Sequence, residues 1–229
     1  MKSIHADICD FHSHVLPGAD HGSSTVVETL EQLKLAKKCG VGRVVATPHF
    51  YPERTDLHTF LVKRNGSYER LMSKWEEKDV ELRVGAEVLI CHNLENFPDL
   101  NKLCIGKSKC LLLELPFHDF FEEYLETSYN LISSGYDIII AHADRYDPEI
   151  VDLFIETGAR LQLNASSLCT FFKRRHLYKW LDEGRVVALG SDIHGPDKKA
   201  YEFFAKATVK IADYIEEIKK SSDKLWNSF

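Results

Sequence analysis

Histidines and carboxylates follow the apolar segments of this chain at several places. The first segment leads into His12 and His14, whose one-residue separation puts both imidazoles on one face of an extended strand. Imidazole and carboxylate groups are the ligands that divalent transition metals prefer. The other candidates follow apolar runs or the first segment's turn, and they are His21, His49, Glu87, Glu114, His142, Asp192 and His194. Their residue types predict a metal centre.

Taken singly, each of these residues would be an ordinary surface or helix-capping group. Glu114 in the run CLLLEL and His142 after DIIIA are harder to explain in that way. A polar or charged group inside an apolar run is costly to bury unless it has a partner. Several such groups that converge on one place are best explained by bound metal ions.

The elements that must position these residues are seven short runs rich in Val, Ile and Leu, as in strands buried on both faces. They span residues 8–12, 43–48, 82–87, 110–115, 137–142, 160–164 and 186–191. Helical periodicity predicts helices over 24–39, 57–78, 119–134, 148–157, 174–183 and 198–220, with none over 88–109. Because the carboxyl ends of parallel strands meet at one end of a sheet, this alternation gathers the candidate ligands.

The fold class predicted from this alternation is α/β, as a distorted seven-stranded (βα) barrel. No linker, repeat or low-complexity tract divides the chain, so residues 1–229 are expected to form one domain. An open doubly wound sheet is the structural alternative. Its first strand normally leads into a G-x-G-x-x-G loop, which is absent here.

Composition excludes several other classes of protein. The 229 residues are 44% hydrophobic and carry a net charge of −6 with both signs mixed, which argues against global disorder and against nucleic-acid binding. No apolar run approaches the roughly 18 residues that span a bilayer, so no membrane insertion is expected. Six cysteines without a C-x-x-C pair are typical of reduced thiols, which predicts a cytoplasmic protein.

Six short motifs occur in a fixed order: D-F-H-S-H, A-T-P-H, G-A-E, L-L-E-L, A-H-A-D-R-Y and S-D-I-H. In this order they resemble the polymerase-and-histidinol-phosphatase (PHP) superfamily, over residues about 7 to 210. H-S-H-V-L-P-G-A-D-H-G and A-H-A-D-R-Y resemble, more narrowly, the manganese-dependent tyrosine phosphatases of bacterial capsule and exopolysaccharide loci, the CpsB/CapC type. The superfamily has a distorted seven-stranded barrel, which agrees with the seven predicted units.

The resemblance implies three divalent ions, which would be manganese by family preference, although the ligand types also suit iron or zinc. The implied ligands of the first ion are His12, His14, Glu87 and Asp192. Those of the second are Glu87, which bridges, Glu114 and His142. Those of the third are His49, His194 and the residue before Gly22. That residue is His21 where the tyrosine phosphatases usually have aspartate, and because Asp20 precedes it, either could be the ligand.

Arg145 in A-H-A-D-R-Y matches the phosphate-binding arginine of the family. The second arginine that usually follows S-D-x-H is missing, and Lys198 and Lys199 lie nearby in its place. The implied reaction is hydrolysis of phosphotyrosine on a protein, expected to be a capsule-pathway tyrosine kinase. A hydroxide bridging two ions would attack phosphorus while Arg145 holds the phosphoryl oxygens, with Glu87 and Asp192 as catalytic ligands.

Other interpretations of the sequence remain open. His21-Gly22 resembles the histidinol-phosphatase branch, and a metal-binding regulatory module without turnover is a third function, against which the full ligand set argues. Cys169 and Arg175 fit the C-x5-R pattern of cysteine-dependent phosphatases, but the residues between them are too bulky for a phosphate-cradling loop. The aromatic residues are expected to form a core and rim cluster, or alternatively a wall for a phosphotyrosine ring; they are Phe117, Phe120, Phe121 and Tyr124. The oligomeric state is left open.

Overall fold

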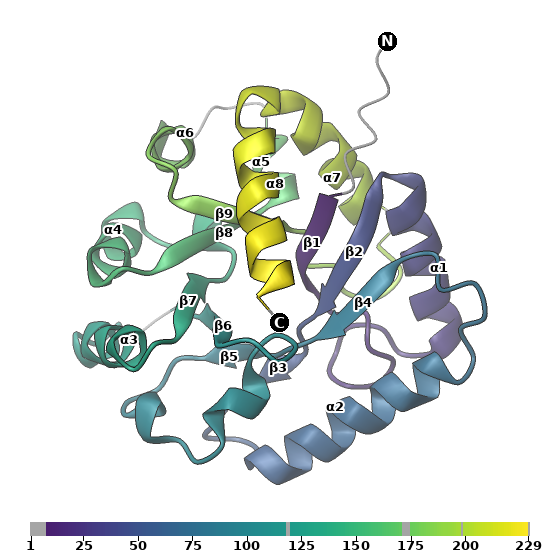
Figure 1. Ribbon diagram of the computed structural model, residues 1–229, viewed down its shortest axis with the longest axis horizontal. Helices are drawn as coiled ribbons and strands as arrows, with labels where there is room; N and C mark the ends of the chain where they lie inside the picture. Colours follow the sequence, from purple (N-terminus) through teal and green to yellow (C-terminus); the bar gives the residue numbers. More distant parts are fainter. Residues whose placement is uncertain (1–7, 118–119, 171–174, 198, 229) are drawn as a thin grey trace.

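The computed structural model describes residues 8–117, 120–170, 175–197 and 199–228. Its centre is a parallel sheet of nine strands that curls into a half-barrel, with helices around its outer side (Figure 1). The strand order is β3-β5-β6-β7-β8-β9-β1-β2-β4. The strands are β1 (Ile8–Ser13), β2 (Val41–Ala46), β3 (His49–Phe50), β4 (Glu81–Val84), β5 (Glu87–Leu89), β6 (Cys110–Glu114), β7 (Asp137–Ile140), β8 (Arg160–Asn164) and β9 (Val186–Gly190).

The strand count is nine, so the predicted count of seven is not confirmed. The second and third predicted strands are each interrupted, the former into β2 and β3 and the latter into β4 and β5. Pro48 interrupts the first because it has no N–H to give to the ladder. Gly85 interrupts the second, where a Cβ atom would lie 2.8 Å from Ile105 Cγ1. After these breaks, His49 and Glu87 are direct partners across β3 and β5.

The helices alternate with the strands, as predicted. They are α1 (Val26–Lys38), α2 (Leu57–Met72), α3 (Glu123–Ser133), α4 (Pro148–Thr157), α5 (Ala165–Leu168), α6 (Arg175–Asp182), α7 (Lys199–Lys210) and α8 (Ala212–Asn227), with 3-10 turns η1 (Leu94–Asn96), η2 (Leu100–Leu103) and η3 (Ala143–Arg145). The last predicted helix is thus two helices, α2 ends earlier than predicted, and α5 was not predicted. None of the described helices combines the length and the apolar character needed to cross a bilayer.

Most strands of the sheet are buried on both faces, and most of the polar candidates lie at or just beyond the carboxyl ends of these strands. Along β6, Leu111 and Leu113 belong to the large core beneath the outer helices, whereas Leu112 belongs to a smaller cluster on the other face. Leu225 and Trp226 of α8, which crosses in front of the sheet in Figure 1, complete that smaller cluster. The polar candidates are therefore held at the carboxyl ends of strands anchored on both sides.

Candidate metal centre

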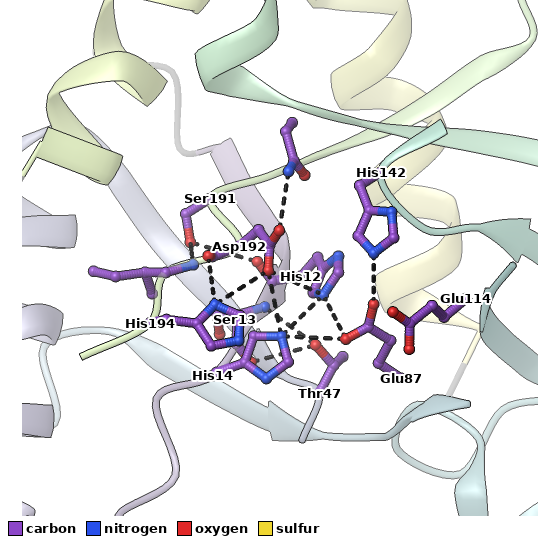
Figure 2. A network of polar contacts seen from close by, with 12 residues as sticks. His12, Ser13, His14, Thr47, Glu87, Glu114, His142, Ser191, Asp192 and His194 are labelled. Atoms are coloured by element: carbon purple, nitrogen blue, oxygen red, sulfur yellow. Dashed lines mark hydrogen bonds and ion pairs between the residues drawn. The ribbon is translucent and has the colours of Figure 1, made fainter. Parts of the chain in front are cut away.

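The carboxyl ends of the strands bring most of the predicted ligands together (Figure 2). His12 and His14 come from the end of β1, and His49 and Glu87 open the short strands β3 and β5. The remaining members follow or end β6, β7 and β9, and they are Glu114, His142, Asp192 and His194. Except for His49 and His194, which are partly exposed, all of these residues are buried.

The Glu87 carboxylate is the centre of the cluster. Its Oε2 atom lies 3.2 Å from His12 Nε2 and 3.3 Å from His14 Nε2. The same oxygen lies 2.8 Å from His49 Nδ1, while Oε1 lies 2.8 Å from His142 Nε2. One buried carboxylate thus contacts four imidazoles, an arrangement suited to a ligand shared between ions.

The two imidazoles of the H-x-H motif are fixed by partners at their outer nitrogens. Gln162 Oε1 accepts from the backbone N–H of His142 at 2.7 Å and lies 2.9 Å from His12 Nδ1, so His12 Nδ1 is the donor. His14 Nδ1 donates to Asp20 Oδ2 at 2.6 Å. When both rings are neutral, their Nε2 atoms, which lie 3.1 Å apart, are left with lone pairs that face the cluster.

Asp20 supports the ligands from behind. Besides His14, it accepts from the backbone N–H of His49 at 3.1 Å through Oδ2 and from that of Gly22 at 2.8 Å through Oδ1. Both carboxylate oxygens are thus engaged by N–H groups. A Cβ atom on Gly22 would lie 2.3 Å from the His14 carbonyl oxygen, so only glycine fits this tight turn. The geometry favours a positioning role for Asp20.

His21, the other residue for which the sequence left a ligand role open, lies at the open side of the cluster. Its ring stacks on His49 at 4.8 Å between centroids and on His194 at 4.6 Å. His194 Nδ1 contacts the backbone oxygen of Asp192 at 3.0 Å. Burial and the charge of His14 lower the pKa of His194 to about 4, so this imidazole is neutral at pH 7 and able to bind a metal ion.

Charges in the cluster are strongly coupled. Burial opposes ionisation of Glu87 and Asp192, but the charge of His12 and the contacts with the other histidines together outweigh it and hold both carboxyl pKa values well below their usual range. Burial likewise opposes protonation of His49, yet the Glu114 and Glu87 carboxylates raise its pKa to about 9. Without metal ions, protons on the imidazoles thus balance the carboxylates.

The donor set fits divalent cations. Three groups of ligand atoms lie within 4.8 Å of one another: His14, His49 and His194; His12, His14 and Glu87; His49, Glu87 and Glu114. Glu114 Oε2 and His194 Nε2 are buried and have no hydrogen-bond partner among the residues that the structure describes. Buried acceptors of this kind are costly unless a cation satisfies them. His49, rather than the expected His142, forms the group with Glu87 and Glu114.

Comparison with known proteins shows the family to which the chain belongs. Residues 8–221 match the family model described as capsular polysaccharide synthesis, CpsB/CapC. The chain belongs to the CpsB/CapC family. CapC of Staphylococcus aureus is 30% identical over 196 residues, which cover 81% of this chain and 76% of that protein. The tyrosine-protein phosphatase YwqE of Bacillus subtilis (strain 168) is 29% identical over 177 residues, 72% of this chain and 68% of that protein.

A solved structure shows the same fold. It comes from work on YwqE of Bacillus subtilis and CpsB of Streptococcus pneumoniae, which are described there as metal-dependent tyrosine phosphatases. The TM-score is 0.75 at 21% sequence identity, and the match covers 93% of this chain and 90% of that one. This CpsB/CapC protein therefore shares its curled parallel half-barrel with that solved structure.

Arg145 lies beside the cluster of this CpsB/CapC protein, in η3. Its Nη2 atom is 2.5 Å from Asp192 Oδ2, and its side chain is 45% exposed. The neighbouring loop carboxylates, Asp144 and Asp147, have contacts of their own. Asp144 accepts from Asn164 N at 2.7 Å, and Asp147 caps α4 at Glu149 N. The guanidinium is thus directed at a predicted ligand and remains open to solvent; Lys198 lies outside the described residues, and Lys199 opens α7.

Sequence reasoning missed two polar residues of β8. Gln162 holds His12 and His142, and its Nε2 donates to Asn164 Oδ1 at 3.0 Å. Asn164 Nδ2 in turn donates to Asp192 Oδ2 at 3.0 Å. The signal was present in R-L-Q-L-N, where two amides alternate with leucine and so share one face of the strand.

Two ligand candidates occupy the left-handed backbone region. His142 has φ of 32° and Asp192 has φ of 51°, which non-glycine residues rarely adopt. His142 lies two residues beyond the end of β7, and Asp192 lies two residues beyond the end of β9. The turn at each place directs the side chain into the cluster. Strained backbone of this kind persists where the surrounding structure enforces it, often at functional sites.

Cys169 does not have the surroundings of a nucleophile. It ends α5, and its Sγ donates to the Phe203 carbonyl oxygen at 3.4 Å. Burial raises the pKa of its thiol, whereas a nucleophilic cysteine needs a lowered pKa. Residues 171–174 of the C-x5-R pattern lie outside the described residues, so only its two ends can be placed.

Proposed function

We propose that this CpsB/CapC protein is a metal-dependent tyrosine-protein phosphatase with a single catalytic domain. The observation that carries the proposal is the buried Glu87 carboxylate among four imidazoles, with Glu114 and Asp192 at its sides. YwqE of Bacillus subtilis and CpsB of Streptococcus pneumoniae, to which the chain is similar, are named tyrosine-protein phosphatases. The donor set and the family thus support the same activity.

The proposed cofactors are three divalent ions, manganese by preference. We assign to the first ion His12, His14, Glu87 and Asp192; to the second Glu87, Glu114 and His142; and to the third His49, His194 and His21. The contact of His49 with Glu87 and Glu114 supports a position of His49 between the second and third sets. When bound, such ions activate water at neutral pH and polarise phosphoryl oxygens.

The chain's own residues would bind and orient the ester. Arg145 presents a guanidinium whose fork suits two phosphoryl oxygens, and binding would exchange its contact with Asp192 for the substrate. Gln162 and Asp20 keep the imidazoles of His12 and His14 in one orientation, so the site need not reorganise. Tyrosinate leaves with a pKa of about 10, so little general-acid help is required.

The proposed substrate is phosphotyrosine on a protein, which we expect to be a bacterial tyrosine kinase acting in capsule synthesis. Support comes from the family description and from the relatives' names. We further propose that the protein works in the cytoplasm, because all six cysteines are free and none carries a disulfide.

A substrate comparison tests the proposal against the histidinol-phosphatase alternative. The purified protein, supplied with manganese, should hydrolyse a phosphotyrosine peptide with higher kcat/KM than histidinol phosphate. A clear preference for histidinol phosphate would overturn the assigned substrate class while leaving the metal centre in place. Bound metal that supports turnover of neither ester would instead indicate a regulatory module.

A further inference from the structure

One aromatic ring borders the metal cluster and is left open to solvent. Phe117 follows Glu114 by three residues, just beyond the carboxyl end of β6. Its ring is nearly parallel to that of His142, with an interplanar angle of 16° and centroids 6.0 Å apart. His142 Nε2 in turn lies 2.8 Å from Glu87 Oε1. Only one imidazole therefore separates Phe117 from the central carboxylate.

The ring of Phe117 packs on a fixed base. Tyr146 lies 5.4 Å from both Phe117 and His142 between centroids. The Tyr146 hydroxyl accepts from the backbone N–H of Leu115 at 3.0 Å, and Tyr146 is almost fully buried. Because its neighbours are held in place, Phe117 has a defined position before any ligand arrives, which lowers the entropic cost of binding against it.

The exposed fraction of Phe117 is 54%, and the same fraction of Phe121 is exposed in the same loop region. A single exposed aromatic residue is ordinary in a folded protein, so its position carries the argument. Phe121 packs edge-on against Tyr124 at 5.8 Å, whereas Phe117 borders an imidazole of the cluster. Phe117 and Phe121 are thus equally exposed, but only Phe117 lies beside the cluster, so Phe121 can serve as a control.

Tyr51 is a second aromatic ring that stacks on an imidazole of the cluster, and it is less exposed than Phe117. Tyr51 stacks on His49 at 5.2 Å, and the Arg54 guanidinium carbon lies 5.0 Å from the Tyr51 ring centroid. An imidazole and a cation thus share the surface of Tyr51. Phe117, at 54%, is the more exposed of the two rings beside the cluster.

We propose that Phe117 forms the subsite for the aryl ring of the substrate, and so selects aryl over alkyl phosphate monoesters. This inference rests on the proposed phosphatase function. A phosphoryl group held at the cluster directs its ester oxygen outward, and an aryl ring on that oxygen can stack on Phe117. Aromatic pairs prefer offset or edge-on contact at 4.5–7 Å between centroids. Phe117 already lies at such distances from His142 and Tyr146.

Binding of phenylphosphonate and methylphosphonate to the manganese-loaded protein tests the proposal without turnover. Phe117→Ala should weaken phenylphosphonate binding by roughly 3- to 10-fold, the size of a lost aromatic pair, and leave methylphosphonate binding unchanged. Phe121→Ala, the matched control, should change neither. Phe117→Tyr keeps a ring and should retain most of the phenylphosphonate affinity. Metal content, measured beside each titration, should be the same in all variants.

Turnover gives a second readout. With a phosphotyrosine peptide, Phe117→Ala should raise KM with little change in kcat, as expected when binding to ground and transition states is lost equally. An equal loss for both phosphonates, or lower metal content, would show that Phe117 merely shields His142. Unchanged binding of both would remove it from the substrate site. A wild-type protein that fails to hydrolyse the peptide would contradict the proposed function itself, which is a distinguishable outcome.

Discussion

Arg145 illustrates how one side chain can be tied to the cluster without being a ligand. Its guanidinium contacts Asp192, yet nearly half of the side chain is exposed. If it clamps phosphate, Arg145→Ala should lower kcat/KM by roughly 30- to 1000-fold, the range for one preorganised donor. Arg145→Lys should recover part of the loss, because an ammonium cannot reproduce the planar fork. Near-normal kcat/KM with a lower melting temperature would instead assign Arg145 a structural ion pair.

Gln162 positions the imidazoles of His12 and His142 through a single oxygen atom. Gln162→Leu removes that acceptor, so the His12 ring can adopt the wrong tautomer. We expect manganese affinity, measured by calorimetric titration, to fall by roughly 10- to 100-fold, as for other residues that support metal ligands. Gln162→Glu keeps the acceptor and should lose less affinity. Equal affinity in wild type and Gln162→Leu would show that the contact does not matter for metal binding.

His49 makes metal binding dependent on pH. Its pKa is raised to about 9, so the ring carries a proton at pH 7 that must leave before it can bind a metal ion. Metal affinity should therefore rise by about tenfold per pH unit for each proton released between pH 7 and 9. The stability of the ion-free protein should show the opposite trend and fall as the pH rises.

The raised pKa of His49 also makes the stability of the ion-free protein depend on pH. A histidine whose pKa is raised by folding stabilises the protein fully below its unfolded pKa of about 6.5. That stabilisation is lost as the pH rises through about 9. Melting of chelated protein across this window should show the loss, and His49→Gln should reduce it, the remainder coming from His12 and His14, whose pKa values are also raised. A pH-independent metal affinity would contradict a protonated His49.

Among the elements, β9 packs closely against β8 and β1 at Gly190. A Cβ atom on Gly190 would lie 2.5 Å from Gln162 Nε2 and 2.7 Å from His12 Cβ. Gly190→Ala should therefore destabilise the protein by about 1–3 kcal/mol, as overpacking commonly does, and weaken metal binding through His12. Thermal melting and metal titration of the variant check both effects.

Gly66 in α2 offers the matched control. A Cβ atom there would have its nearest contact at 3.6 Å, with the flexible Arg70 side chain. Because glycine inside a helix costs about 0.5–1 kcal/mol relative to alanine, Gly66→Ala should raise the melting temperature slightly. If Gly190→Ala melts like wild type and binds manganese equally well, the close packing around β9 does not constrain the site.

Local signals predicted some elements to the residue and others only in part. Helix α4 begins and ends as predicted because Asp147 caps it, Pro148 opens it and Gly158 at φ of 103° ends it, all readable in sequence. The close approach of Ile105 to Gly85, where β4 and β5 separate, joins residues distant along the chain and could not be predicted from neighbouring residues. Helical periodicity also continued through Ile211, whose backbone (φ of −107°, ψ of 34°) separates α7 from α8.

At the scale of the whole molecule, the sheet explains why so many site residues could be predicted. Parallel strands bring their carboxyl ends together, so polar residues after apolar runs meet even when they are far apart in sequence. The pairing of His14 with Asp20, the contact of Arg145 with Asp192 and the role of Gln162 depend on side-chain geometry. Spacing does not encode that geometry, and it emerged only with the structure.

The most direct test of the metal-dependent phosphatase is turnover of a phosphotyrosine peptide by the whole chain before and after removal of its metal ions. Exhaustive chelation should reduce turnover to background, and manganese should restore it in proportion to the metal bound, because the donor set around Glu87 has no other role in this account. Undiminished turnover by protein in which no metal is detected would contradict it.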